Sequence, residues 1–428
     1  MRWIRCFGLL LLSVFVASCG GNGHPVAPPT DFAVQEVGDT QVTLNWTAEP
    51  GVSYWVWFAP GTTMTTQNYD KTANVQAWTL VTPPFVLKGS KSGIALTNGT
   101  TYSFSVNART GDAPGGAPAA IVTATPRMSG TTWSAGPDVK GATLRGVTSA
   151  TLVTGLAMVG VGDAGRVLTS TDNVTWTAVP TSVTSNQLND VVFAYNKFIA
   201  VGAGGTIVYS EDGQTWTAAT SPVTQGLNAV FFNGARLTAV GQGGAVLTST
   251  DGVSWKVLAV DGLTQDLNTV TWSSAGYWLA AGASGALYTS ADGQAWSAVA
   301  LTGVPASAAS AQWRSAATLA TTVTSGTTVS TQYVTALAGQ AGQMMTSLDG
   351  KTWTLVSAAV GTSANLNKIL ASNGQFLVAG DAGTILTSPD GSVWTSRLSS
   401  GAAPFYGLIR FANAYTAYGQ GGVTAISR

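Results

Sequence analysis

One motif recurs along the last two thirds of this 428-residue chain and restricts the folds that the chain can adopt. The motif, called the box below, reads Ser-x-Asp-x-x-x-Trp, and its six copies begin at Ser170, Ser210, Ser249, Ser290, Ser347 and Ser388. Successive copies lie 39 to 41 residues apart, except for one interval of 57 residues. A repeat of this length indicates a unit that buries its apolar side against copies of itself.

A pair of glycines, spaced as Gly-x-x-Gly, precedes every box by eight residues. A seventh pair, Gly419 and Gly422, has no box after it, whereas Gly130-Thr-Thr-Trp133 is the end of a box with nothing before it. Each repeat predicts four short strands, and joining the two incomplete ends completes seven units over residues 128–428. The sequence therefore predicts a seven-bladed β-propeller in which a strand near Trp133 pairs with the C-terminal strand, because closure removes exposed sheet edges.

The polar and aromatic box residues have structural roles in this prediction. Ser and Asp side chains form hydrogen bonds within a tight turn, the residue after Asp needs a permissive backbone, and Trp covers the hairpin. We assign these side chains to the scaffold and not to a metal site: Asp172, Asp212, Asp251, Asp292, Asp349, Asp390, Trp176, Trp216, Trp255, Trp296, Trp353 and Trp394. The box resembles the Asp-box (BNR) repeat of sialidases and of propellers like the photosystem II assembly factor. That resemblance implies that the boxes lie at the periphery, away from the ligand-binding face.

The candidate ligand-binding residues come from the starts of the first strands, at the mouth of the central channel. In four repeats the predicted first strand begins with Leu-Asn. In the other three repeats we assign Arg, Gln and Tyr to the position of this Asn. The resulting ring is Arg145, Asn189, Asn228, Asn268, Gln312, Asn367 and Tyr406. Amides suit sugar hydroxyls or peptide backbone because they both donate and accept hydrogen bonds. The alternative is that each Asn caps the turn entering its strand, since recurrence within a repeat is typical of a structural role.

Few residues are available for catalysis. The chain holds one histidine, His24, and two cysteines, Cys6 and Cys19, which excludes a His-based triad and a zinc cluster. We predict no metal and no cofactor. A sialidase-like site would need a Glu and an arginine clamp, but Glu211 in a box is the only Glu of residues 128–428, and Arg145 is the only arginine expected at the mouth. The remaining catalytic alternative is a glycosidase that uses Asp163 and Asp381.

The interval of 57 residues predicts a longer hairpin between Trp313 and Ala338, rich in Thr, Ser and Val, on the box side of the ring. A tolerated insertion and a contact with a partner both remain open for it.

The N-terminus predicts export. Residues 1–19 carry Arg2 and Arg5 before a short apolar run, which is too short to span a membrane. The end of this run, Val-Ala-Ser-Cys19, resembles a bacterial lipobox, which implies that the signal is removed and that Cys19 carries lipid. By the same resemblance, Gly20 favours the outer membrane; an ordinary secretory signal is the alternative. Residues 20–29 are rich in Gly and Pro and predict a flexible tether.

Residues 30–127 predict a β-sandwich of about one hundred residues. Apolar residues alternate along its strands, as in Tyr54, Val56 and Phe58, and Leu96 stands six residues before Tyr102, the spacing of a tyrosine corner. The segment resembles a fibronectin type III domain, which implies a spacer or adhesive module.

The whole chain is thus expected to be all-β, with a fibronectin type III sandwich followed by the propeller. We expect a monomeric lipoprotein of the cell envelope that binds a protein or glycan through the propeller face without catalysis. Nineteen basic residues balance nineteen acidic ones, so no basic field attracts nucleic acid. A carbohydrate-active enzyme and an assembly factor for envelope proteins are the alternatives.

Overall fold

The computed structural model describes residues 23–428 except 92, 94, 181–182, 326–327, 357–359 and 399–402. The predicted signal sequence and Cys19 therefore lie outside the described residues. The chain divides into two compact units, one ending at Arg127 and the other running Met128–Arg428. Neither unit contains, among its described residues, a helix that is both long and apolar enough to cross a membrane.

The first unit consists of two antiparallel sheets around one apolar core. One sheet has the order β2 (Ala33–Gly38), β3 (Gln41–Asn45) and β6 (Phe85–Leu87). The other has the order β1 (Pro25–Val26), β7 (Tyr102–Arg109), β4 (Ser53–Pro60) and β5 (Gln76–Val81), with β8 (Val122–Ala124) also paired to β7. Alternate residues of the long strands point into the core, including Leu44, Val56, Phe58, Phe104 and Val106.

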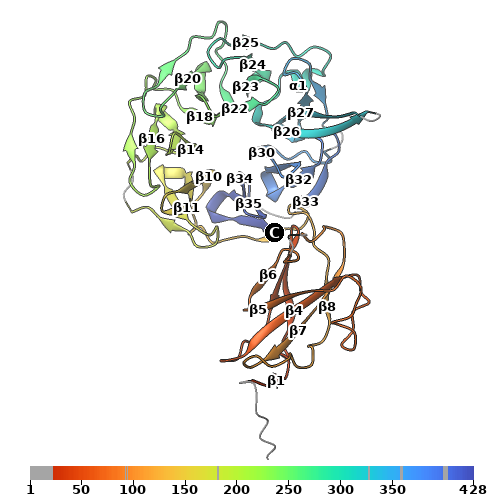
Figure 1. The fold of residues 1–428 in the computed structure, drawn as a ribbon. Coiled ribbons are helices and arrows are strands. Elements are labelled where there is room, and N and C mark those ends of the chain that lie inside the picture. Colours follow the sequence, from red (N-terminus) through yellow and green to blue (C-terminus); the bar gives the residue numbers. More distant parts are fainter. Residues whose placement is uncertain are drawn as a thin grey trace, which may run out of the picture. The chain divides into compact units, whose positions relative to one another are not determined.

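The second unit is a ring, and its described residues form seven four-stranded antiparallel sheets, called blades one to seven (Figure 1). The first strands of the blades are β10 (Leu144–Leu152), β14 (Leu188–Ala194), β18 (Leu227–Phe232), β22 (Leu267–Ser273), β26 (Trp313–Ser325), β30 (Leu366–Ser372) and β34 (Phe405–Phe411). The second strands are β11 (Gly155–Gly162), β15 (Lys197–Gly202), β19 (Leu237–Gly241), β23 (Tyr277–Gly282), β27 (Thr328–Gly339), β31 (Gln375–Gly380) and β35 (Ala414–Gly419). This arrangement is a β-propeller, and the prediction of an all-β chain with a propeller is confirmed.

The outer strands are shorter. The third strands are β12 (Val167–Ser170), β16 (Ile207–Ser210), β20 (Val246–Ser249), β24 (Leu287–Ser290), β28 (Met344–Ser347), β32 (Ile385–Ser388) and β36 (Thr424–Ser427). The fourth strands are β13 (Thr177–Ala178), β17 (Thr217–Ala218), β21 (Lys256–Val257), β25 (Ser297–Ala298), β29 (Thr354–Leu355), β33 (Thr395–Leu398) and β9 (Ser134–Ala135). One short helix, α1 (Ala306–Ala309), precedes blade five.

The apolar cores lie between neighbouring blades. Ile199 and Val201 of blade two, for example, share a buried cluster with Leu237, Leu247 and Trp255 of blade three. Every second residue of the inner strands is apolar, so each blade presents side chains to the blade on either side. A blade alone would leave these faces exposed to water, and the ring buries them.

The boxes form the turns between the third and fourth strands. In blade two, the Ser210 hydroxyl oxygen accepts the Gly213 N–H at 2.8 Å, and the Trp216 ring N–H donates to the Gly213 carbonyl at 3.0 Å. Asp212 Oδ1 accepts the backbone N–H groups of the two residues that follow Gly213. In the box of blade five, the equivalent bonds from Thr352 and Lys351 hold the pKa of Asp349 at about 2, well below its ordinary value. The constant spacing of Ser, Asp and Trp in each box is therefore explained by the hydrogen bonds of this turn.

Blade seven is assembled from both ends of the unit. Ser134 and Ala135 of β9 pair with Ile426 and Ala425 of β36, which confirms the predicted closure. The seventh box is also rebuilt from the two ends, because the Ser427 hydroxyl accepts the Gly130 N–H at 2.8 Å. The Trp133 ring N–H donates to the Gly130 carbonyl at 3.0 Å, as in the boxes of blades two, three, five and six. The sequence indicated the strand pairing and the end of a box at Gly130–Trp133, but not that Ser427 supplies its serine.

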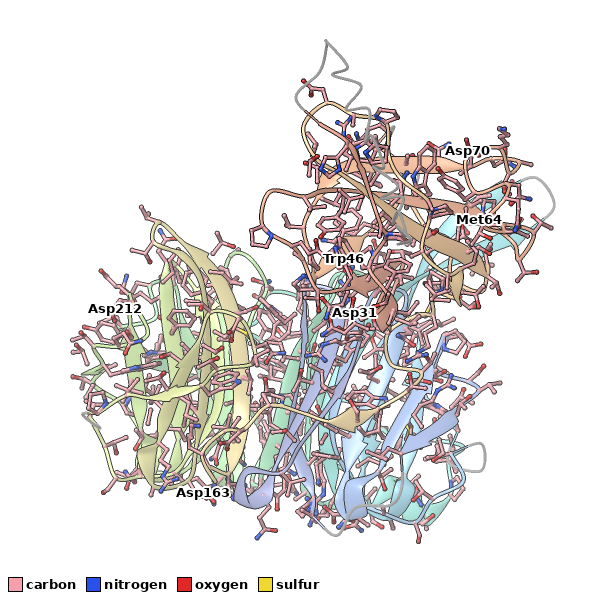
Figure 2. All side chains as sticks on the ribbon, turned by 90° about the horizontal axis from the view of Figure 1, so that it is seen from below. Asp31, Trp46, Met64, Asp70, Asp163 and Asp212 are labelled. Carbon is pink, nitrogen blue, oxygen red and sulfur yellow. The ribbon has the colours of Figure 1, made fainter. Side chains whose placement is uncertain are left out.

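The glycine pairs form the turns between the second and third strands, and the two glycines serve different needs. Gly162 is extended, but a Cβ there would lie 1.8 Å from the Thr143 carbonyl oxygen, so the first glycine permits close approach of two backbones. Gly165 has a φ of +67°, a left-handed conformation that favours glycine. These turns and the loops into the first strands form one face of the ring, called the mouth face. Figure 2 shows Asp163 at the edge of that face, with Asp212 of a box away from it.

Candidate functional site

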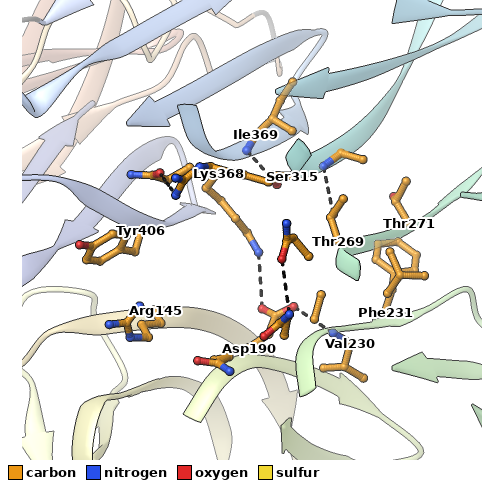
Figure 3. A pocket seen from close by; sticks show the side chains of 18 of the residues that line it. Arg145, Asp190, Val230, Phe231, Thr269, Thr271, Ser315, Lys368, Ile369 and Tyr406 are labelled. Carbon is orange, nitrogen blue, oxygen red and sulfur yellow. Dashed lines mark hydrogen bonds and ion pairs between the residues drawn. The ribbon is translucent and has the colours of Figure 1, made fainter. Parts of the chain in front are cut away.

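A cavity of about 810 Å³ lies at the centre of the ring, where the first strands converge, and all seven of these strands line it (Figure 3). Each first strand carries a bulge at its second residue, as between Leu188 and Asp190. The bulge turns this second residue toward the mouth. The seven residues of the predicted ring, Arg145, Asn189, Asn228, Asn268, Gln312, Asn367 and Tyr406, all line the cavity.

Blade five requires a correction of the predicted ring. Trp313 pairs with Gly339 as Leu188 pairs with Gly202, so the residue equivalent to Asn189 is Arg314 and not Gln312. Gln312 lines the cavity from the loop before the strand. The expectation that Arg145 is the only arginine at the mouth was therefore wrong. The error arose because Trp replaces the usual Leu in this blade, which hid the register of the strand.

The four asparagines of the ring are joined to the neighbouring blades. Each donates its side-chain N–H to the carbonyl of the first residue of the next first strand: Asn189 to Leu227 (2.8 Å), Asn228 to Leu267 (2.9 Å), Asn268 to Trp313 (2.8 Å) and Asn367 to Phe405 (3.0 Å). The amides therefore link successive blades. The asparagines therefore have a structural role, but they bond to the next blade, whereas the sequence analysis considered a cap of the turn within the same blade.

A second set of bonds between blades follows one residue further along the first strands. Side-chain oxygens of Asp190, Thr269 and Ser315 accept backbone N–H groups from the next first strand, at 3.2, 3.1 and 3.1 Å (Figure 3). These bonds satisfy buried N–H groups beside each bulge. Together the two sets form a belt of hydrogen bonds that joins blades two to seven along the channel.

An ion pair that the sequence analysis missed crosses the channel. Lys368 of β30 reaches from blade six to Asp190 of β14 in blade two, with 3.5 Å between Nζ and Oδ1 (Figure 3). The Asp190 side chain is 13% exposed, so its charge is largely withdrawn from water and requires a partner. No sequence pattern pairs residues 178 positions apart on opposite sides of a ring.

Three blades depart from the asparagine belt, at Arg145, Arg314 and Tyr406. The Arg145 Nε lies 2.7 Å from Asp163 Oδ1, and its guanidinium carbon lies 5.0 Å from the centre of the Tyr406 ring. Arg314 donates from Nη1 to Asn367 Oδ1 at 3.1 Å, and its side chain is exposed. Among the described residues, no carboxylate lies within 4 Å of the Arg314 guanidinium, whereas Arg145 and Lys368 each have one.

The two acidic residues of the glycosidase hypothesis are both engaged by neighbouring side chains. Asp163 accepts from Arg145, as described above. Both carboxylate oxygens of Asp381 accept side-chain N–H groups, from Asn365 and Asn367, each at 2.8 Å. Within the described part of the chain, no group of three or more His, Cys, Asp or Glu side chains is placed to hold a metal ion.

Comparisons with known proteins agree on the fold. The DUF6242 beta propeller domain family matches residues 131–267. No curated protein matches the sequence. Among solved structures, YCF48 bound to D1 peptide is 18% identical with a TM-score of 0.53, and the match covers 71% of this chain and 99% of that one. Virginiamycin B lyase from Staphylococcus aureus is 10% identical with a TM-score of 0.56, and the match covers 69% of this chain and 99% of that one. The WD40 propeller of Doa1 is 12% identical with a TM-score of 0.51, and the match covers 70% of this chain and 97% of that one. At these identities the similarity shows the fold alone.

Proposed function

We propose that the second unit is a non-catalytic binding module that takes an extended segment of a partner polypeptide at the mouth of its cavity. The ligand contacts are Arg145, Arg314 and Tyr406. One observation carries this proposal: these three positions break a hydrogen-bond rule that the asparagines of the other four blades obey. Positions where a repeat gives up the structural bond that its other copies share are expected to serve function.

The chemistry of the three side chains favours a peptide with an acidic group. Guanidinium groups bind carboxylates through two parallel hydrogen bonds, and Arg314 has no carboxylate partner in the described structure. The stacked pair of Arg145 and Tyr406 offers a flat surface for a side chain or a peptide plane. That YCF48, a protein of the same fold, is known with a bound peptide supports a role of this kind.

The alternatives receive less support from the same contacts. A glycan would need the ring amides as donors, but each amide already uses one of its two N–H groups on a carbonyl of the neighbouring blade. A glycosidase would need two carboxyls presented to the substrate, whereas both oxygens of Asp381 accept bonds within its own blade. An assembly factor for envelope proteins is a form of the proposed polypeptide binding and stays compatible with it.

We also propose that the module is lipid-anchored to the outer membrane through Cys19, which becomes the first residue after removal of residues 1–18, with 20–29 as a tether. In this proposal residues 30–127 are a fibronectin type III spacer and residues 128–428 an Asp-box propeller. The sheet orders β2-β3-β6 and β5-β4-β7-β8 support the spacer assignment. The Tyr102 hydroxyl accepts the Thr97 N–H at 3.1 Å beside buried Leu96, as a tyrosine corner requires.

The test is site-specific photocrosslinking in cells. Tyr406 is replaced by p-benzoylphenylalanine, which keeps an aromatic ring, and the same amino acid at exposed Val153 on the box side is the matched control. We expect one protein adduct from position 406, none from position 153, and loss of the adduct when Arg314→Gln is added. An adduct that is indifferent to Arg314→Gln, or binding to a glycan array with no protein adduct, would refute the proposal.

A further inference from the structure

The hairpin of β26 and β27 in blade five extends past the rim of the ring (Figure 1). β26 has 13 residues, whereas the first strands of the other blades have six to nine. The ladder continues without a bulge after Ser315, through Ala320 opposite Tyr333 to Ser325 opposite Thr328. The segments 320–325 and 328–333 are called the ribbon below. The sequence predicted this long hairpin but left its purpose open.

Both outer edges of the ribbon lack a neighbouring strand in the described structure. β28 pairs with β27 only as far as Thr335, and β26 is the first strand of its sheet. On each segment, the backbone N–H and C=O groups of alternate residues therefore face solvent, as at any open sheet edge. Such an edge pairs best with another extended backbone.

The ribbon carries none of the features by which proteins usually protect an open edge. Its twelve residues include no charged residue, no proline and no glycine, and most are Thr, Val or Ser. Val323 and Val329 are 40% and 65% exposed. Regular, uncharged and β-branched edges are the ones that pair with other strands.

We propose that the ribbon pairs edge to edge with the ribbon of a second copy of this chain and forms a two-fold homodimer. An uncharged edge has no charge that would select a different partner, and an antiparallel two-fold pairing closes the same edge in both copies. The pairing edge is 320–325 of β26, because β28 continues the sheet beside β27 as far as Thr335, whereas in the described structure no strand pairs with the outer edge of β26. This inference replaces the expectation of a monomer.

The dimer is independent of the proposed ligand site. The ribbon lies on the box side of the ring, whereas Arg145, Arg314 and Tyr406 line the cavity toward the mouth face. Failure of the dimer therefore leaves peptide binding untouched, and loss of peptide binding leaves the dimer untouched.

The experiment measures the mass of the purified full-length chain in detergent by size-exclusion chromatography with light scattering. We expect a dimer that dissociates on dilution, and a dissociation constant raised about tenfold or more by Val323→Lys, because the substitution places a like charge on each of the two paired edges. Val153→Lys, at an exposed hairpin tip of blade one, is the matched control and leaves the dimer intact. Replacing residues 320–333 with Asn-Gly shortens the hairpin to the length of its neighbours and gives a monomer with an unchanged melting temperature.

Three results would overturn the inference. The first is a monomeric wild-type chain up to about 100 μM, the range of weak interfaces. The second is a dimer that persists after the ribbon is shortened. The third is equal disruption by Val153→Lys, which would show a general effect of charge on association.

Discussion

The replacement Asn228→Ala tests whether the ring asparagines hold the blades together and do not bind the ligand. It removes the bond between blades from Asn228 Nδ2 to the Leu267 carbonyl at 2.9 Å, together with a longer one to Asn268 Oδ1 at 3.4 Å. A hydrogen bond of this kind contributes about 1 kcal/mol net, so the free energy of unfolding is expected to fall by that amount. In a unit of this size the melting temperature should fall by about 2 °C. Thermal unfolding followed by circular dichroism measures this.

Asn228→Asp makes the test sharper. The acid places a second acceptor against the Leu267 carbonyl, so at pH 7 this variant should be less stable than Asn228→Ala. A protonated acid can donate to the carbonyl, and the folded state therefore raises the pKa of the new carboxyl. The bond from the protonated side chain of the Asn228→Asp variant is fully present below the unfolded pKa of about 3.9 and is lost as pH rises through the raised folded pKa. The melting temperature of the Asp variant should therefore rise relative to that of the Ala variant as pH falls toward 4.

Photocrosslinking from position 406 measures ligand binding, whereas the melting temperature measures stability, and Asn228→Ala and Arg314→Gln should affect these two measurements in opposite ways. Asn228→Ala should leave photocrosslinking unchanged, whereas Arg314→Gln should abolish it and leave the melting temperature within about 1 °C of the wild type. The reasoning is refuted if Asn228→Ala keeps full stability, or if it removes the adduct from a chain that remains folded. The first result would show that the amide does not hold the blades together, and the second would place it in the binding site.

Three further predictions use the same thermal assay. Gly162→Ala should cost about 3 kcal/mol or more, because its Cβ would lie 1.8 Å from a carbonyl oxygen. Gly421→Ala has no atom within 4 Å of its Cβ but has a φ of +64°, so it should cost only the backbone strain of about 1–2 kcal/mol; equal losses would contradict the close-approach argument. The pKa of Asp349 is about 2 in the fold, so its carboxylate stabilises the fold at pH values above the ordinary pKa of 3.8, and this stabilisation is lost as pH falls toward 2. Asp349→Ala should therefore weaken the fall of the melting temperature in acid, and an unchanged fall would contradict the assignment. Ser427→Ala should cost about 1–3 kcal/mol because the buried Gly130 N–H loses its acceptor, and an unchanged melting temperature would show that the rebuilt box does not hold the ring.

Much of the candidate site was accessible from the sequence because the repeat fixes equivalent positions. The Leu-Asn pattern identified the second residue of four first strands, and the structure places all seven predicted residues at the cavity. The pattern failed in blade five, where Trp313 replaces Leu and the register came out wrong. It also could not say what the amides bind, since their acceptors are carbonyls about 40 residues further along the chain.

The sequence alone determined the propeller, the closure by the two ends of the unit and the long hairpin of blade five. These follow from short-range chemistry, namely turn residues and alternating apolar positions, repeated at a regular interval. Tertiary structure alone decided which mouth residues are committed to the belt, that Lys368 meets Asp190 across the channel, and that Ser427 completes a box with Gly130. Those contacts join residues that are distant in the chain, and only closure of the ring brings them within bonding distance.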